Sequence, residues 1–273
     1  AIANSPGLAV AGVVSRSGRR PEDLPASAGV WPTLAAVDAP FDAVILTTPN
    51  GLHHQGAIEA AALGKHVLTE KVLEISRDAM DRMMRACREA NVKLAVTYQR
   101  RMSPDNRALK QLLDAGRLGR VFAADMTVKF WRDAAYYRSG AYRGTRAIDG
   151  GGAFTQQAAH NADLLCWFFG LPDKVVSLCD RFVHDIEVED HGVALLHYPN
   201  GMIGTFTAST ACRPGFATRL ELHATGGSLV TENDSITHWS IDGVPNPAEK
   251  KFQVHDGATS AAVADTAGHE AIL

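Results

Sequence analysis

Short apolar runs alternate with segments of helical periodicity from residue 8 to about residue 97. The runs expected to be strands are 8–14, 41–46, 66–68 and 92–97, and the expected helices are 55–63 and 76–90. An uninterrupted apolar run bounded by turn residues is typical of a strand that is covered on both faces. Alternation of such strands with helices predicts a doubly wound parallel sheet.

The pattern changes after residue 98. Helices are expected over 103–116 and 153–169, and strands over 121–130, 175–182, 189–198, 202–209, 218–225 and 228–231. Pro199-Asn200-Gly201 predicts a tight hairpin turn between two of these strands. Because little helix separates the later strands, this part is expected to form a mainly antiparallel open sheet with helices on one face.

The same change of pattern predicts two domains, an α/β domain over residues 1–98 and an α+β domain over residues 99–273. Residues 1–7 have the character of the last turn of a helix, and residues 269–273 that of a helix just begun. We therefore expect the first domain to be incomplete at its N-terminus and the second at its C-terminus.

Composition narrows the classes of function. The chain has 273 residues, 46% of them hydrophobic, and a net charge of −3 without a basic stripe, which argues against nucleic acid as a partner. The four cysteines lie far apart without ligand spacing, so we expect reduced, mostly buried thiols, a cytoplasmic location and no metal site. No apolar run is long enough to span a membrane, and no signal peptide is visible.

Residues 64–71 combine a helix end, a short strand and two adjacent charges. Gly64 is placed to end the preceding helix, and Glu70 and Lys71 follow the run 66–68. Ligands of open parallel sheets bind at the carboxyl ends of the strands, where a lysine can act on a substrate hydroxyl. The plain alternative is a surface ion pair.

The tip of the first apolar run carries Ser15 and Arg16 and no acidic residue. In a dinucleotide-binding unit an acid at this position binds the ribose 2′-hydroxyl, whereas an arginine accommodates a 2′-phosphate. Ser15 and Arg16 therefore permit NADP, although a solvated basic loop explains them equally well. Downstream, Thr48 or Asn50 can supply the oxygen that caps the helix expected after residue 54.

The helix after Gly150-Gly151-Gly152 carries polar groups near its start. Gln156 and His160 are four residues apart and share a face, and Asp163 can lie close to His160. The glycines would let a polyhydroxylated ligand approach the backbone closely. A lone helical histidine is more often structural, and a metal site is disfavoured because no second ligand lies nearby.

Several motifs along the chain resemble one family, the glucose–fructose oxidoreductase/inositol dehydrogenase (Gfo/Idh/MocA) family of NAD(P)-dependent sugar oxidoreductases. Residues 47–53 resemble its loop over the cofactor pyrophosphate and ribose, and residues 64–71 its GKHV-x-x-EKP signature. Residues 98–101 resemble the segment that opens its second domain. Trp131-Arg132, residues 142–145 and residues 150–163 resemble its substrate-site block.

The resemblance implies a Rossmann-type first domain that binds NADP or NAD, and a second domain for substrate binding and oligomerisation. Lys71 would be the catalytic lysine and His160 the general acid/base. The other residues implied to line the cofactor are Thr47, Thr48, Pro49, Asn50, His53, Glu70, Gln99, Trp131 and Arg132. Lys71, Arg143, Gln156, Gln157, His160 and Asn161 would bind substrate.

The chain departs from the family pattern at three places. Val72 stands where the family usually has proline, which leaves the backbone after Lys71 undefined, and Gln156 stands where many members have aspartate. The glycine-rich GxGxxG turn and its strand, which cradle the phosphates, are missing from the sequence.

The function expected from these residues is reversible hydride transfer between a nicotinamide and a secondary hydroxyl of a sugar, cyclitol or nucleotide sugar. Two alternatives stay open, a non-catalytic binding relative and an NAD-using lyase or glycosidase on the same fold. We also expect a homodimer or homotetramer formed through the second-domain sheet, with Leu195, His197, Phe206 and Ala208 on its exposed face.

Overall fold

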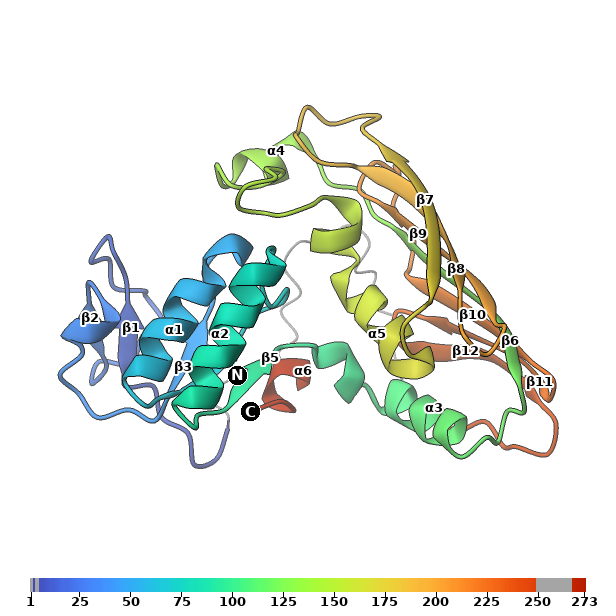
Figure 1. The fold of residues 1–273 in the computed structure, drawn as a ribbon, viewed down its shortest axis with the longest axis horizontal. Helices are drawn as coiled ribbons and strands as arrows, with labels where there is room; N and C mark the ends of the chain where they lie inside the picture. The colour runs from blue at the N-terminus through green and yellow to red at the C-terminus, as the bar shows by residue number, and fades with distance from the viewer. Residues whose placement is uncertain (1, 3–4, 249–266) are drawn as a thin grey trace. The chain divides into compact units, whose positions relative to one another are not determined.

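The computed structural model describes residues 2, 5–248 and 267–273; of the helix end expected at residues 1–7, positions 1, 3 and 4 lie outside these. The chain divides into two compact units, Ala1–Thr97 with His269–Leu273, and Tyr98–Gly268. Parallel strands form the first unit, and a mainly antiparallel sheet forms the second (Figure 1). The fold class expected from the sequence is thereby confirmed.

The strands of the first unit form two parallel sheets. One pairs β1 (Gly12–Val14) with β2 (Gly29–Trp31), and the other has the order β3 (Ala43–Leu46), β4 (His66–Thr69), β5 (Leu94–Val96). The short strand β2 was not expected from the sequence, and β1 is much shorter than the apolar run that predicted it. Within the described chain β1 and β3 each have only one strand neighbour, so the parallel sheet is split between them.

Helices α1 (His53–Ala62) and α2 (Arg77–Glu89) pack together against the three-stranded sheet. Alanines 57 and 60 of α1 are fully buried, and Met83 and Cys87 of α2 complete the core. The Ser76 hydroxyl accepts a hydrogen bond from the backbone N–H of Ala79 and caps α2. Gly64 ends the α1 region with a φ of +69°, a conformation that favours glycine.

The second unit is built on a seven-stranded sheet in the order β12-β11-β10-β6-β9-β8-β7. All neighbours are antiparallel except β6 and β9, which run parallel. The strands are β6 (Val121–Lys129), β7 (Lys174–Asp180), β8 (His191–His197), β9 (Ile203–Ser209), β10 (Arg219–Ala224), β11 (Gly227–Glu232) and β12 (Ser235–Ile241). Strand β12 was missed in the sequence because its polar residues hide the alternation.

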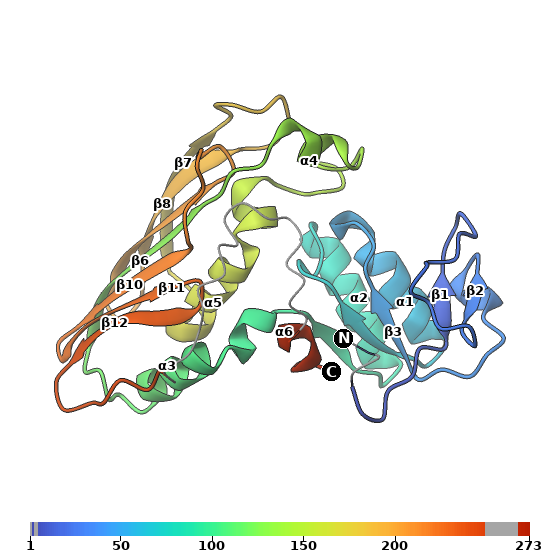
Figure 2. The same cartoon turned by 180° about the vertical axis from the view of Figure 1, so that it is seen from behind.

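Helices α3 (Pro104–Asp114) and α5 (Ala159–Phe169) cover one face of this sheet (Figures 1 and 2). The helix expected over 153–169 begins instead with a π-helical turn, η5 (Ala153–Gln157). Single π turns are frequent at functional sites. The remaining helical segments are η2 (Leu34–Ala36), η3 (Asn50–Leu52), η4 (Gln99–Met102), α4 (Ala134–Arg138) and α6 (Ala267–Glu270).

Alternation along the strands sorts the residues of the sheet into a covered and an open face. Phe206 and Ala208 lie on the covered face and are buried, so their expected exposure is wrong. The open face carries the apolar side chains of Val176, Leu178, Val193, Leu195 and Ile203, all exposed. We call these five residues the open-face patch.

Candidate functional site

The register of the parallel sheet brings two predicted site segments to one edge. Leu46 pairs with Thr69, so the segment that begins at Thr47 and the Glu70–Lys71 pair leave neighbouring strands side by side. Thr69 also pairs with Val96, and Thr97 donates from its backbone N–H and its hydroxyl to the carbonyl of Thr69. This is the carboxyl edge, where open parallel sheets bind ligands.

The side chain of His53 joins these two segments. Its ring is fully buried; Nε2 lies 2.8 Å from the carbonyl oxygen of Thr48, and Nδ1 lies 2.8 Å from that of Val72. A residue expected to line the cofactor is therefore engaged on both ring nitrogens by the protein. Its ring holds the loop after β3 against the backbone that follows Lys71.

Glu74 caps α1 from a distance in sequence. Its buried carboxylate accepts a hydrogen bond of 3.1 Å from the backbone N–H of His54 and one of 2.7 Å from that of Ile75. The N-cap residues of η3 and α1 are Pro49 and Leu52, so neither Thr48 nor Asn50 occupies the capping position expected from the sequence. A negative charge suits this position because the start of a helix carries partial positive charge.

Lys71 is half-buried and follows Glu70 directly. Its backbone N–H donates to Glu70 Oε2 at 3.2 Å, and Glu70 Oε1 lies 3.4 Å from Nε2 of His269. The peptide bond between Lys71 and Val72 is cis.

The other predicted cofactor residues belong to segments outside the β3–β4–β5 sheet. Ser15 follows β1 and contacts the hydroxyl of Ser17 at 3.0 Å, while Arg16 is exposed. Gln99 lies in η4 of the second unit, where its Oε1 is buried without a hydrogen-bond partner.

The glycine-rich segment before η5 is filled by the protein itself. Glu189 accepts hydrogen bonds from the backbone N–H groups of Gly152, Ala153 and Phe154 through its carboxylate and its carbonyl. A Cβ at Gly152 would lie 1.7 Å from the Glu189 carbonyl oxygen. Gly152 thus permits the close approach of Glu189.

The polar residues of η5 and α5 point in different directions. Gln156 donates to the buried carboxylate of Asp149 at 2.6 Å, and the ring of His160 makes an edge contact with Tyr98 at 6.0 Å. Asn161 is buried and donates to the sulfur of Met126. Asp163 binds Arg101 through two hydrogen bonds of 2.7 and 2.5 Å.

An aromatic and arginine cluster follows β6. The guanidinium of Arg132 lies 5.2 Å from the ring centroid of Tyr136, and that of Arg143 lies 4.4 Å from the same centroid. Gln157 accepts from Arg132 Nε at 3.0 Å and donates to the Tyr136 hydroxyl at 2.6 Å. The structure therefore brings Arg132, Arg143 and Gln157 together around one tyrosine of α4.

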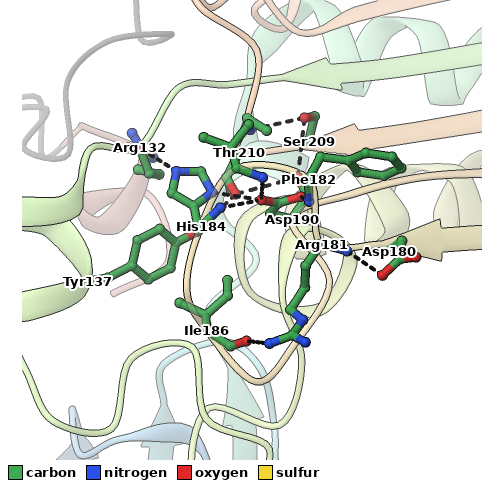
Figure 3. Close-up of polar contacts among 12 residues, drawn as sticks. Arg132, Tyr137, Asp180, Arg181, Phe182, His184, Ile186, Asp190, Ser209 and Thr210 are labelled. Carbon is green, nitrogen blue, oxygen red and sulfur yellow. Dashed lines mark hydrogen bonds and ion pairs between the residues drawn. The ribbon is translucent and has the colours of Figure 1, made fainter.

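The carboxylate of Asp190 organises the loop behind this cluster (Figure 3). It is fully buried and accepts from the backbone N–H groups of Phe182, Val183 and His184 at 2.8–2.9 Å. His184 Nδ1 lies 3.0 Å from Asp190, and its Nε2 lies 2.7 Å from the carbonyl oxygen of Arg132. The imidazole thus links the buried acid to the backbone of Arg132.

Burial alone would raise the pKa of Asp190. The hydrogen bonds from the backbone of His184, Val183 and Phe182, and from the His184 side chain, outweigh burial and hold the pKa below its ordinary value. Nothing in the sequence marked Asp190, His184 or Glu74, because each acts through partners that only the fold brings close.

The described residues contain no group of three or more metal-binding side chains arranged to hold an ion, and no helix among them is long and apolar enough to cross a membrane. The four cysteines are free. Only Cys87 is buried, whereas Cys166 and Cys179 are exposed, so the expectation of mostly buried thiols is wrong.

Parallel strands followed by a mainly antiparallel sheet with helices on one face define the architecture of a Rossmann-type oxidoreductase. Residues 1–98 match the family model described as an oxidoreductase family with an NAD-binding Rossmann fold. Residues 106–230 match the C-terminal domain of the GFO/IDH/MocA family. The chain belongs to this family, as the motifs in its sequence indicated.

Named relatives are dehydrogenases and reductases. The chain is 31% identical to 1,5-anhydro-D-fructose reductase of Ensifer adhaerens, over 72% of the chain and 58% of the relative, and 25% identical to inositol 2-dehydrogenase of Rhizobium meliloti, over 81% and 67%. The WlbA dehydrogenase of Bordetella pertussis, solved with NADH and UDP-GlcNAcA, is 31% identical with a TM-score of 0.76, covering 80% of the chain and 64% of WlbA. The chain thus spans about three fifths of these proteins' length.

We predict that Asp190→Ala lowers the free energy of unfolding by about 3–5 kcal/mol, because it leaves buried donors without their acceptor. Urea unfolding at neutral pH measures the change. Since the pKa of Asp190 is lower in the folded chain than its unfolded value of about 3.9, its stabilisation is present above that pH and is lost as the pH falls through the folded pKa. The wild type should therefore lose stability more steeply than the variant below about pH 4.

The matched control is Asp180→Ala, because Asp180 is exposed and accepts one hydrogen bond, from the backbone of Arg181. Its cost should stay within about 0.5 kcal/mol. Equal losses in the two variants would contradict the organising role of Asp190.

Proposed function

We propose that the chain belongs to an NAD(P)-dependent oxidoreductase that transfers hydride between a nicotinamide and a secondary hydroxyl of a sugar, cyclitol or nucleotide sugar. The observation that carries the proposal is Lys71 at the carboxyl edge of β4, beside the loop that begins at Thr47. Family membership and the activities named for the relatives support it. None of the named relatives supports a non-catalytic relative, a lyase or a glycosidase.

Lys71 and His160 are proposed to act on the same hydroxyl. The ammonium of Lys71 stabilises negative charge that develops on the hydroxyl oxygen, and His160 exchanges the hydroxyl proton as general acid or base. Gln156, Gln157, Asn161 and Arg143 are the further residues proposed for substrate binding. With a glutamine at position 156, the lysine and histidine work without a neighbouring carboxylate from that position.

The nicotinamide cofactor, when bound, accepts or supplies the hydride. The residues proposed to hold it are the segment 47–50, Glu70 and Lys71 at the edge of the parallel sheet, with Ser15 and Arg16 after β1, and Gln99, Trp131 and Arg132 from the second unit. The donor-rich loops after β3 and β4 fit such a ligand, whereas the phosphate-cradling glycine turn is not among these residues. Exposed Arg16, without a nearby acid, favours NADP over NAD.

A cytoplasmic location is part of the proposal. Its support is chemical: the cysteines are unpaired, and two of them are exposed, which suits a reducing compartment.

Lys71→Ala and His160→Ala in the intact protein are each expected to reduce kcat by about 100- to 10,000-fold, the usual contribution of a positioned acid or base. Turnover is followed by the absorbance of the reduced nicotinamide with a panel of sugars, cyclitols and nucleotide sugars. Lys93→Ala and His238→Ala remove exposed side chains of the same types and should leave kcat unchanged. Retention of most turnover by either site variant would refute its assigned role.

We further propose a homodimer or homotetramer that pairs the open-face patch of one copy with that of another. The register supports a continuous apolar surface, because Leu195 faces Val176 and Val193 faces Leu178 across β7 and β8. Leu178 is 84% exposed and Leu195 is 54% exposed. A contiguous apolar surface exposed to water is unusual in a protein that remains monomeric. The same flat surface on two copies suits a two-fold interface.

Light scattering after gel filtration should give at least twice the chain mass of 29.2 kDa for the wild type. Leu195→Glu should yield monomers because a charge in this apolar contact would be buried without a partner. Leu171→Glu, which alters a more exposed leucine outside the sheet, should assemble like the wild type. A monomeric wild type, or an assembled Leu195→Glu variant, would rule out this interface.

A further inference from the structure

Two arginine side chains meet at one tyrosine ring without an acidic partner. Arg132 and Arg143 both lie over Tyr136, and neither forms an ion pair with any residue of the described chain. Their hydrogen bonds go to neutral groups, from Arg132 Nε to Gln157 and from Arg143 Nη1 to the Tyr136 hydroxyl at 2.7 Å. Arg143 Nε is buried, and no described residue forms a hydrogen bond with it.

The two positive charges are costly where they stand. Burial lowers the pKa of Arg132, the hydroxyls of Tyr136 and Tyr137 counteract this, and the charge of Arg143 lowers the pKa further. Like charges are therefore held close together in partly desolvated surroundings, and the π faces of Phe130, Tyr136 and Tyr142 compensate them only in part. Such an arrangement is stabilised when an anion joins it.

The acids of this region are already committed elsewhere. Asp133 is exposed and caps α4 by accepting from the backbone N–H of Tyr136 at 2.8 Å. Asp149 binds Gly144 and Gln156, and Asp190 binds its own loop and His184. These three carboxylates therefore do not supply a negative charge that would balance Arg132 and Arg143.

The donors are also pre-organised. The Tyr136 hydroxyl accepts from Gln157 and from Arg143, so its own proton remains to be donated. His184 fixes the backbone carbonyl of Arg132 through its contact with Nε2. An oxyanion that meets fixed donors gains affinity because less ordering is needed on binding.

We propose that Arg132, Arg143 and the Tyr136 hydroxyl form a subsite for an anionic oxygen group of the substrate, a carboxylate or a phosphate. The inference rests on the proposed function and narrows its substrate class to acidic or phosphorylated sugars. Arg132, which is also among the residues proposed to hold the cofactor, contributes to this subsite as well. Planar guanidinium groups bind carboxylate and phosphate through paired hydrogen bonds, which neutral sugars do not offer.

The test is isothermal titration of the full chain without cofactor, so that no turnover is required. The probes are UDP-GlcNAcA, UDP-GlcNAc, which keeps the diphosphate but has a neutral sugar, and glucuronate. Arg132→Gln and Arg143→Gln should each weaken binding of UDP-GlcNAcA by roughly 10- to 100-fold, the effect of losing hydrogen bonds to a charged group. Arg138 is an exposed arginine at the end of α4, the helix that carries Tyr136, and the variant Arg138→Gln should bind like the wild type.

The probes separate the two sources of the anion. If the subsite binds the sugar carboxylate, the variants lose affinity for UDP-GlcNAcA and glucuronate but not for UDP-GlcNAc. If it binds the diphosphate, both nucleotide sugars are weakened equally and glucuronate is unaffected. Either pattern supports the subsite.

The proposal is overturned if the wild type binds none of these probes, or if both site variants bind them as the wild type does. Should Arg143→Gln fail to fold, Arg143→Lys keeps the charge but not the planar fork and should still lose affinity. Because binding is measured without hydride transfer, a failed subsite and a failed oxidoreductase assignment give different results.

Discussion

Buried carboxylates that must find hydrogen-bond donors hold the loops of the candidate site in place. Moving a carboxylate out of water costs free energy unless hydrogen-bond donors contact its oxygens. Each of these acids therefore accepts hydrogen bonds from backbone N–H groups. Buried Glu74 binds the start of α1 and buried Asp190 binds the loop before β8, and half-buried Glu189 binds the start of η5. These hydrogen bonds favour the observed loop conformations, because breaking them would leave buried acceptors unsatisfied.

This constraint separates the charges of the molecule into two kinds. The acids around the site are saturated by the protein's own backbone, whereas Arg132 and Arg143 are met by neutral groups. Lys71 lies on a loop held by His53, and His160 lies on a helix whose start is held by Glu189. Lys71 and Arg132 thus lie on segments that hydrogen bonds of the protein hold in place.

Strands that depend only on neighbouring residues in the sequence could be predicted from it. Uninterrupted apolar runs predicted β3, β4 and β5, and the position of Glu70 and Lys71 at the sheet edge follows from strand order alone. Three-residue β2 and the polar strand β12 lack such a signal. The faces of β9 were inverted for Phe206 and Ala208, because alternation gives two faces without saying which one the helices cover. Glu74 and Asp190 could not be recognised, since their donors lie elsewhere in the chain.

Lys71 and His160 are proposed to act together on one hydroxyl. The most direct measurement is a double-mutant cycle in the intact protein, comparing kcat/KM for Lys71→Ala, His160→Ala and the double variant. Residues that act as a unit give strongly non-additive effects. The account predicts that the double variant loses little more activity than the worse single variant. A loss equal to the product of the two single losses would show independent action and contradict it.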